Sequence, residues 1–218
     1  MRLNWRGIIF DRDGTLFDSL PVILKAFEYG IELFTEKRPT AEEWFAAFGP
    51  AEPEVMGKFI SSDHKPEAFR RFYDYYREHF EEVRLFPGIA GLLFRLKAAG
   101  AGLMLFTGGG KVSTRFCLEQ AGIDHVFDAL ICGEDVACPK PDPEGVLKLM
   151  QIQGLTSGET VVVGDAPADI LAAKAAGVSS ILVRFGEHGQ SGDSSVRPDY
   201  FCLSVRELEL LLMTEDAL

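Results

Sequence analysis

Two carboxylates separated by one residue are the feature of this sequence with the clearest chemical use. Asp11 and Asp13 lie in the segment DRDGT, residues 11–15, directly after the apolar run GIIF of residues 7–10. One carboxylate can act as a nucleophile, its neighbour can carry a proton, and oxygens of both can bind a divalent cation. A polar turn, in which Asp and Gly serve the turn geometry, would use the same residue types. The segment alone leaves both interpretations open.

Residues with useful chemistry follow three further apolar runs. The runs cover residues 102–106, 129–132 and 160–163, and the residues that follow them include Thr107, Lys140 and Asp165. Helical patterns separate the runs, at residues 91–99, 112–120, 144–151 and 170–176. Strands that alternate with helices predict crossover connections and the mostly parallel sheet of an α/β protein. Because ligands bind at the carboxyl edge of such sheets, we expect these residues to meet there.

Taken in order, the polar segments resemble the four motifs of the haloacid dehalogenase (HAD) superfamily. They are Asp11-x-Asp13-Gly14-Thr15, Thr107-Gly108, Lys140-Pro-Asp-Pro-Glu144 and Gly164-Asp165-x-x-x-Asp169. The resemblance runs from the first predicted strand to the helix after Asp169, and the tail to about residue 212 also fits. It is closest to the capped phosphatase branch, which includes phosphoglycolate phosphatase-like enzymes. The implied fold is a Rossmann-like, doubly wound, mostly parallel sheet with an inserted all-helical cap.

The cap domain is expected at residues 17–85, and the HAD-like α/β core at residues 1–16 and 86–218. Within the insertion, apolar residues repeat at helical spacing from Leu20 to Phe34, with Ser19 or Asp18 as N-cap, and aromatic residues repeat from Phe69 to Phe80. Two shorter helices are expected at residues 41–48 and 54–60. An insertion with both ends at the active-site edge is well placed to act as a lid.

The resemblance assigns a role to each carboxylate at the sheet edge. Asp11 would attack phosphorus to form an aspartyl-phosphate, and Asp13 would protonate the leaving alcohol and then activate water. Mg²⁺ would be held by the Asp11 carboxylate, the Asp13 backbone carbonyl and the Asp165 carboxylate, an all-oxygen set that suits this ion. Asp165 could instead be only the N-cap of the next helix.

The same resemblance implies how phosphate would be bound. The Thr107 hydroxyl and the Gly108 backbone N–H would hold phosphoryl oxygens, and Lys140 would neutralise charge on Asp11 and on the phosphate. Asp169 would orient Lys140 or bind a metal-ligating water, and an ordinary first-turn acid that complements the helix dipole is the alternative. Thr107 could also cap the following helix, and Lys140 taken alone would be an ordinary loop lysine.

Composition limits the partners. The chain has 22 Lys and Arg against 33 Asp and Glu, a net charge of −11, which argues against nucleic acid or a membrane surface as a partner. The four cysteines have no CxxC or zinc spacing and are typical of reduced cytoplasmic residues. The sequence shows no signal peptide and no apolar stretch of transmembrane length. We therefore expect a cytoplasmic protein, and the resemblance implies that its partner is a small phosphorylated metabolite. The sequence leaves the oligomeric state, monomer or dimer, open.

Single residues separate competing functions within the resemblance. Dehalogenases and phosphonatase-type relatives lack an acid at the position of Asp13. A phosphomutase like β-phosphoglucomutase shares the cap, the metal and both aspartates and stays an alternative, although Thr15 favours a phosphatase. A non-catalytic, phosphate-ligand-binding regulatory protein would be free to lose residues such as Lys140 and Asp165, which are present. Arg12 stands where the motif is usually hydrophobic, and we expect it to point away from the site or into the cap interface.

Overall fold

A six-stranded parallel sheet forms the centre of the protein. The computed structural model describes residues 2–186 and 196–214. The strand order is β6-β5-β2-β7-β8-β9, and every pair of neighbours is parallel. The strands are β2 (Gly7–Phe10), β5 (Gly102–Phe106), β6 (Ala129–Ile131), β7 (Thr160–Gly164), β8 (Ser179–Val183) and β9 (Tyr200–Cys202). The predicted Rossmann-like, doubly wound α/β fold is confirmed.

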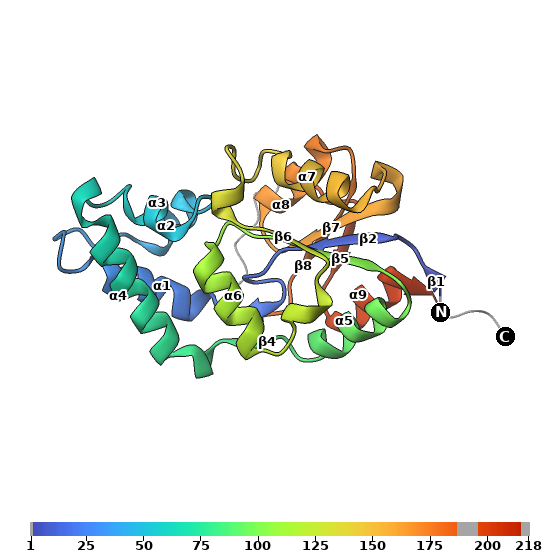
Figure 1. Cartoon of the computed structure of the whole chain (residues 1–218), viewed down its shortest axis with the longest axis horizontal. Coiled ribbons are helices and arrows are strands. Elements are labelled where there is room, and N and C mark those ends of the chain that lie inside the picture. Colours follow the sequence, from blue (N-terminus) through green and yellow to red (C-terminus); the bar gives the residue numbers. More distant parts are fainter. Residues whose placement is uncertain (1, 187–195, 215–218) are drawn as a thin grey trace.

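Helices cover both faces of the sheet, which explains why its strands are apolar without alternation. Ile8 and Phe10 share a hydrophobic cluster with side chains of α5 (Ile89–Ala98), α6 (Lys111–Gln120) and α9 (Val205–Leu212). Ile9 belongs to a second cluster, which includes side chains of α7 (Glu144–Gln153) and α8 (Pro167–Ala175). Figure 1 shows α7 and α8 on the side of the sheet opposite to α5 and α9.

The strand register aligns the carboxyl ends of the three central strands. Phe10 of β2 is paired with Leu105 of β5 and with Val163 of β7. The backbone N–H of Asp11 continues this pattern by donating to the carbonyl oxygen of Val163 at 2.9 Å. The first residues after these strands therefore emerge side by side at one edge of the sheet, between β2 and β7, where the direction of the strand order changes.

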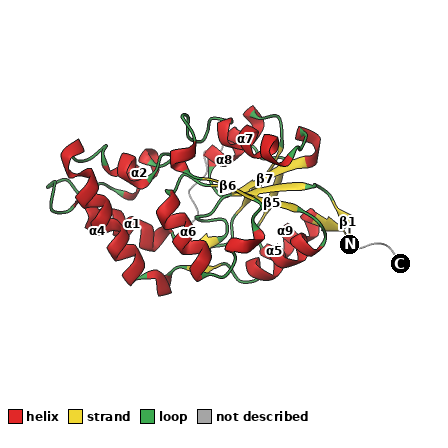
Figure 2. Cartoon of the chain, viewed as in Figure 1, coloured by secondary structure: helices red, strands yellow, loops and turns green. Residues whose placement is uncertain are grey.

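The segment between β2 and α5 is helical. Its helices are α1 (Leu20–Ile31), α2 (Ala41–Ala47), α3 (Glu52–Met56) and α4 (Lys65–Glu78). A short antiparallel ribbon of β3 (Phe17–Asp18) and β4 (Arg84–Leu85) brackets them. Figures 1 and 2 show these helices gathered at one end of the molecule, away from the bulk of the sheet. The ribbon lies at the predicted boundaries of the cap, residues 17 and 85, and the division into core and cap domains stays a prediction.

Aromatic side chains hold the cap helices together. Phe27 of α1 packs against Trp44 of α2 with ring centroids 5.0 Å apart and against Phe72 of α4 at 4.7 Å. Trp44 and Phe72 are at most 1% exposed. Phe80, after α4, meets Phe116 of α6 at 5.0 Å, so this aromatic cluster is continuous with one side of the core. The aromatic repeat of the cap thus forms packed interior, as the helical spacing predicts.

Some elements differ from the sequence prediction or were not anticipated by it. The helix expected at residues 54–60 is α3, Glu52–Met56, because Pro53 suits the first turn of a helix and starts it earlier. The strands β8 and β9 and the helix α9 were not predicted. The first and last described residues are joined by an antiparallel pair, β1 (Arg2–Leu3) and β10 (Met213–Thr214).

Two further expectations concern cysteines and membranes. All four cysteines are free; Cys117, Cys132 and Cys202 are buried and Cys138 is exposed. Among the residues that the structure describes, no helix has the length and apolar character needed to cross a membrane.

Candidate active site

The polar residues that follow the strands meet in one pocket. Its lining includes every site residue expected from the sequence, namely Asp11, Asp13, Thr107, Gly108, Lys140, Asp165 and Asp169. The pocket lies between the carboxyl edge of the sheet and the cap helices, and it encloses about 900 Å³, including the part that is open to solvent. Residues from four separate loops are therefore brought together as the parallel topology predicts.

Lys140 is the centre of the ion pairs in this pocket. Its Nζ donates to Asp11 Oδ1 and to Asp169 Oδ1, both at 2.6 Å, and to the Phe106 carbonyl oxygen at 2.8 Å. The side chain is 7% exposed. Burial opposes its charge, but Asp11 and Asp169 outweigh burial and raise the pKa of Lys140 above its usual value. The lysine is therefore a fixed cation that joins the loops after β2 and β7.

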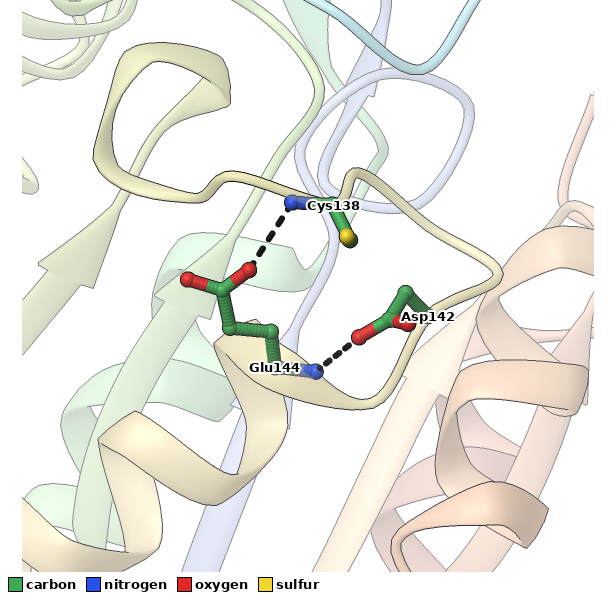
Figure 3. Close-up of side chains that lie close together, drawn as sticks. All are labelled: Cys138, Asp142 and Glu144. Atoms are coloured by element: carbon green, nitrogen blue, oxygen red, sulfur yellow. Dashed lines mark hydrogen bonds between the residues drawn. The ribbon is translucent and has the colours of Figure 1, made fainter.

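The loop that carries Lys140 is held by its own side chains. Figure 3 shows Cys138, Asp142 and Glu144 close together in this loop. The Glu144 carboxylate accepts hydrogen bonds from the backbone N–H groups of Ala137 and Cys138, at 2.9 and 2.8 Å. Asp142 accepts from the backbone N–H of Glu144 at 2.9 Å. The Glu144 carboxylate also accepts from Lys148 Nζ. Glu144 and Asp142 therefore hold the loop in shape through hydrogen bonds to its backbone.

Three carboxylates crowd the floor of the pocket. Asp11, Asp165 and Asp169 are at most 8% exposed, and each offers an oxygen within 4.8 Å of the others. Burial, opposed by Lys140 and reinforced by Asp169 and Asp13, raises the pKa of Asp11 to about 7. Burial and the charges of Asp11 and Asp169 also raise the pKa of Asp165. Like charges held this closely need a cation or protons.

The carboxylate oxygens fit a divalent cation. Asp165 Oδ2 is buried and has no hydrogen-bond partner, while Oδ1 accepts from the Thr15 hydroxyl at 3.2 Å. Gly14, with φ of +82°, leaves room for this carboxylate, because a Cβ there would lie 2.2 Å from Asp165 Oδ2. Asp169 is already engaged, since Oδ1 binds Lys140 and Oδ2 accepts from the Ala166 N–H at 3.1 Å. These contacts favour Asp11 and Asp165 as ligands and Asp169 as the residue that orients Lys140.

Thr107 and Gly108 form the turn that enters α6. The Thr107 hydroxyl oxygen accepts from the backbone N–H of Gly109 at 3.0 Å, which leaves its own hydrogen to be donated into the pocket. A Cβ on residue 108 would lie 2.7 Å from the Gly49 carbonyl oxygen, so only glycine lets the cap approach this closely. The turn therefore offers donors for an anion directly beneath the cap.

Arg12, which departs from the motif, is a buried link between the loop after β2 and α6. It is 2% exposed, and its Nε and Nη2 donate to Asp13 Oδ2 at 2.8 and 2.7 Å. Its Nη1 donates to Thr114 Oγ1 at 2.6 Å and lies 3.3 Å from Ser113 Oγ. Of the two orientations expected for Arg12, the one into the cap interface is observed. A charged residue at a position where the motif is usually hydrophobic was the sequence signal for this network.

Two residues that the sequence did not assign to the site complete this network. Ser19 stands at the N-cap position of α1, but its hydroxyl donates to Asp13 Oδ1 at 2.6 Å and makes no cap hydrogen bond. Glu52, the first residue of α3, is 4% exposed and accepts from Ser113 Oγ at 2.5 Å and from the Gly110 N–H at 2.9 Å. Burial raises the pKa of Glu52, and Arg12 opposes this effect. Cap and core are thus joined by buried polar contacts.

The chain is similar to known proteins along most of its length. Residues 8–183 match the family described as haloacid dehalogenase-like hydrolase. PpaX of Caldanaerobacter subterraneus subsp. tengcongensis, which carries the name of a pyrophosphatase, is 31% identical over 89% of either chain. The phosphoglycolate phosphatase of Escherichia coli K12 is 31% identical, over 93% of this chain and 90% of the relative.

The fold is also similar to solved structures. A predicted phosphoglycolate phosphatase from Haemophilus somnus 129PT superimposes with a TM-score of 0.81 at 23% identity. The superposition covers 95% of this chain and 98% of that one. At this identity the likeness supports the fold alone.

We predict that Mg²⁺ stabilises the protein more at pH 8 than at pH 5. Asp11, whose pKa is about 7 in the fold against 3.8 when free, retains a proton on folding, so stability falls as pH rises between these values. A bound cation replaces that proton and removes the loss. At a Mg²⁺ concentration of 100 times its Kd, the free energy of unfolding should rise by about 2.7 kcal/mol. Urea unfolding with and without MgCl₂ at both pH values measures this effect.

Asp165→Asn provides the control for the cation. The amide keeps the shape of the side chain but removes the negative charge proposed to bind the cation. The rise in the free energy of unfolding with Mg²⁺ should therefore be lost. An equal Mg²⁺ response in this variant and in the wild type would contradict the ligand assignment.

A second prediction concerns the buried Arg12 network. Arg12→Leu leaves the charges of Asp13 and Glu52 without their partner, and loss of one member of a buried ionic network typically costs about 3–5 kcal/mol. Arg12→Leu combined with Glu52→Gln should recover part of this loss, because the positive charge of Arg12 and the negative charge of Glu52 are then removed together. Arg70→Leu is the control, because Arg70 is 61% exposed and its ion pairs on α4 are open to solvent. Urea unfolding that shows equal costs for Arg12→Leu and Arg70→Leu would refute the role of the network.

Proposed function

Because the chain belongs to the haloacid dehalogenase-like hydrolase family and is a phosphatase of that family, we propose that it is a Mg²⁺-dependent enzyme that forms an aspartyl-phosphate on Asp11. Its substrate is a small phosphorylated metabolite, and the name of the Escherichia coli relative makes a monoester of the phosphoglycolate type the first candidate. The observation that carries the proposal is the 2.6 Å contact of Lys140 with Asp11, beside a buried Asp165 oxygen that lacks a partner. This arrangement can neutralise both a carboxylate nucleophile and an incoming phosphate.

In the first step, a carboxylate oxygen of Asp11 attacks phosphorus and the bond from phosphorus to the leaving oxygen breaks. Lys140 binds Oδ1, so Oδ2 is the oxygen proposed to attack. Asp13 donates its proton to the leaving oxygen, which departs as the alcohol. The hydroxyl of Thr107 and the N–H of Gly108 bind the phosphoryl oxygens as charge develops on them.

In the second step, Asp13 removes a proton from water, and the resulting hydroxide attacks phosphorus to release inorganic phosphate and regenerate Asp11. Arg12 and Ser19 hold the two Asp13 oxygens in place for this task, at 2.8 and 2.6 Å. Mg²⁺, held by the carboxylates of Asp11 and Asp165 and the Asp13 carbonyl, would supply further compensation of negative charge when bound. Asp169 orients Lys140.

The alternatives are a phosphomutase of the β-phosphoglucomutase type and a non-catalytic regulatory protein that binds a phosphate ligand. A phosphatase is favoured over the mutase by Thr15, whose hydroxyl is buried against Asp165. An enzyme is favoured over a binding protein because Lys140 is aligned with two carboxylates rather than left for a ligand alone. A cytoplasmic location, the absence of nucleic-acid and membrane partners, and a monomeric or dimeric state stay predictions.

Release of inorganic phosphate from a panel of phosphate esters tests the proposal directly. The panel should contain 2-phosphoglycolate and pyrophosphate, after the names of the two relatives, together with alkyl and sugar phosphates. Activity should disappear in EDTA and return with Mg²⁺. Full turnover in the chelator would contradict the proposed metal dependence.

A third prediction separates the roles of the two aspartates. Asp13→Asn keeps the nucleophile but lacks the group that activates water, a loss typically worth ~10²–10⁴-fold in rate. With acetyl phosphate, whose leaving group needs little protonation, this variant should accumulate one phosphoryl group per chain. Asp11→Asn should acquire none. Intact-mass analysis after a rapid quench measures both, and an adduct on Asp11→Asn would show that the nucleophile is wrongly assigned.

A further inference from the structure

Beyond the phosphate-binding groups, the pocket continues into a chamber with an apolar wall. The wall, named here the cap wall, consists of Leu20, Ile23, Phe27, Phe45, Phe48 and Val55. These residues come from α1, from α2 and its C-terminal end, and from α3. Phe72 of α4 lies behind them in the same lining and is 1% exposed. The side of the pocket opposite the carboxylates is therefore mostly hydrocarbon.

The described lining offers no free cation for a second negative group. Its only cationic side chains are Arg12 and Lys140. Arg12 is paired with Asp13, and Lys140 is paired with Asp11 and Asp169. The same lining holds the carboxylates of Asp11, Asp13, Glu52, Asp165 and Asp169. A leaving group with its own carboxylate or phosphate would meet like charges and an apolar wall, and an unpaired buried charge is strongly disfavoured.

The cap lies directly on the core in this structure, so the wall is positioned as a bound substrate would meet it. A Cβ on Gly108 would lie 2.7 Å from the Gly49 carbonyl oxygen, and one on Gly133 would lie 2.7 Å from the Ala51 nitrogen. Glu52 of α3 accepts from the Gly110 N–H of the core at 2.9 Å.

We propose that the substrate is a phosphate monoester whose leaving group is uncharged and mainly apolar, an alkyl or aryl alcohol that packs against the cap wall. This inference rests on the proposed phosphatase function. It departs from the phosphoglycolate type of substrate, because the glycolate leaving group carries a carboxylate. The apolar body gains from leaving water, whereas a terminal carboxylate loses its hydration and finds no partner. The anionic phosphoryl group itself is met by Lys140, Thr107 and the cation site.

A pair of esters matched in chain length tests the substrate class. Butyl phosphate and 4-phosphonooxybutanoate have the same carbon chain and differ in the terminal carboxylate. We expect kcat/KM to be at least about tenfold higher for butyl phosphate, because the carboxylate would be buried unpaired. From methyl to butyl phosphate, kcat/KM should rise by roughly fourfold for each methylene that is buried. Phosphate release with saturating Mg²⁺ gives these values.

The variant Phe45→Arg places a cation in the cap wall at a half-buried position. Its ratio of kcat/KM for the two esters should shift toward the carboxylated ester. Leu33→Arg is the matched control, since Leu33 is 68% exposed on the cap and is not part of the lining, and its ratio should equal that of the wild type. Thermal unfolding shows whether each variant is folded, and the wild-type ratio decides the matter if Phe45→Arg is not.

The outcomes distinguish this inference from the function on which it rests. Acetyl phosphate has a small leaving group that needs little protonation, so its hydrolysis reports the phosphatase chemistry with the least contribution from the cap wall. Hydrolysis of acetyl phosphate together with equal or better use of 4-phosphonooxybutanoate would overturn the substrate class and leave the phosphatase intact. Failure to release phosphate from acetyl phosphate and from every ester would overturn the proposed function, and the substrate class with it.

Discussion

The compensation of like charges at the carboxyl edge of the sheet is the constraint on which the rest of the structure depends. Parallel strands in register bring Asp11 and Asp165 to neighbouring positions, and the turn into α8 adds Asp169. All three are buried, so their mutual repulsion is poorly screened. Lys140 neutralises the charge of Asp11 and Asp169. Its loop must therefore be held in position, and hydrogen bonds of Glu144 and Asp142 to backbone N–H groups do this. The remaining oxygen of Asp165 is the position that fits a cation.

Arg12 extends the same principle to the cap. A buried guanidinium requires negative charge nearby. Arg12 forms an ion pair with Asp13 in the loop after β2 and interacts electrostatically with the carboxylate of Glu52 on α3. The Ser113 hydroxyl at the start of α6 connects Arg12 to Glu52, and Thr114 gives Arg12 a further acceptor. Because buried polar groups must remain paired, separation of the cap from the core would expose or unpair this network. The cap is therefore held over the site by contacts that also fix the orientation of Asp13.

The sequence was informative where a physical rule links residue type to position. The apolar runs predicted β2, β5, β6 and β7, and their register explains why Asp11, Thr107 and Asp165 meet. Apolar spacing predicted α1 and aromatic spacing predicted α4, while α2 and α3 were expected as short helices and Pro53 moved the start of α3. Glu52 and Ser113 could not be found in this way. The two residues bind each other across 61 positions of the sequence, and no periodic pattern marks either of them. Ser19 was expected as a helix cap, and only the fold shows that its hydroxyl faces Asp13.

The apolar character of the cap wall follows from how the cations are used elsewhere. Lys140 and Arg12 are both committed to carboxylates, so no described side chain of the lining is left to balance a further negative charge. Under that condition, hydrocarbon is the wall least costly to place against a buried acidic site, because it adds no polar group that needs a partner. Selection among substrates would then rest on the exclusion of charged leaving groups as much as on the attraction of apolar ones to the cap wall. Under the two proposals, the sheet edge determines the chemistry and the helices that cover it select the leaving group.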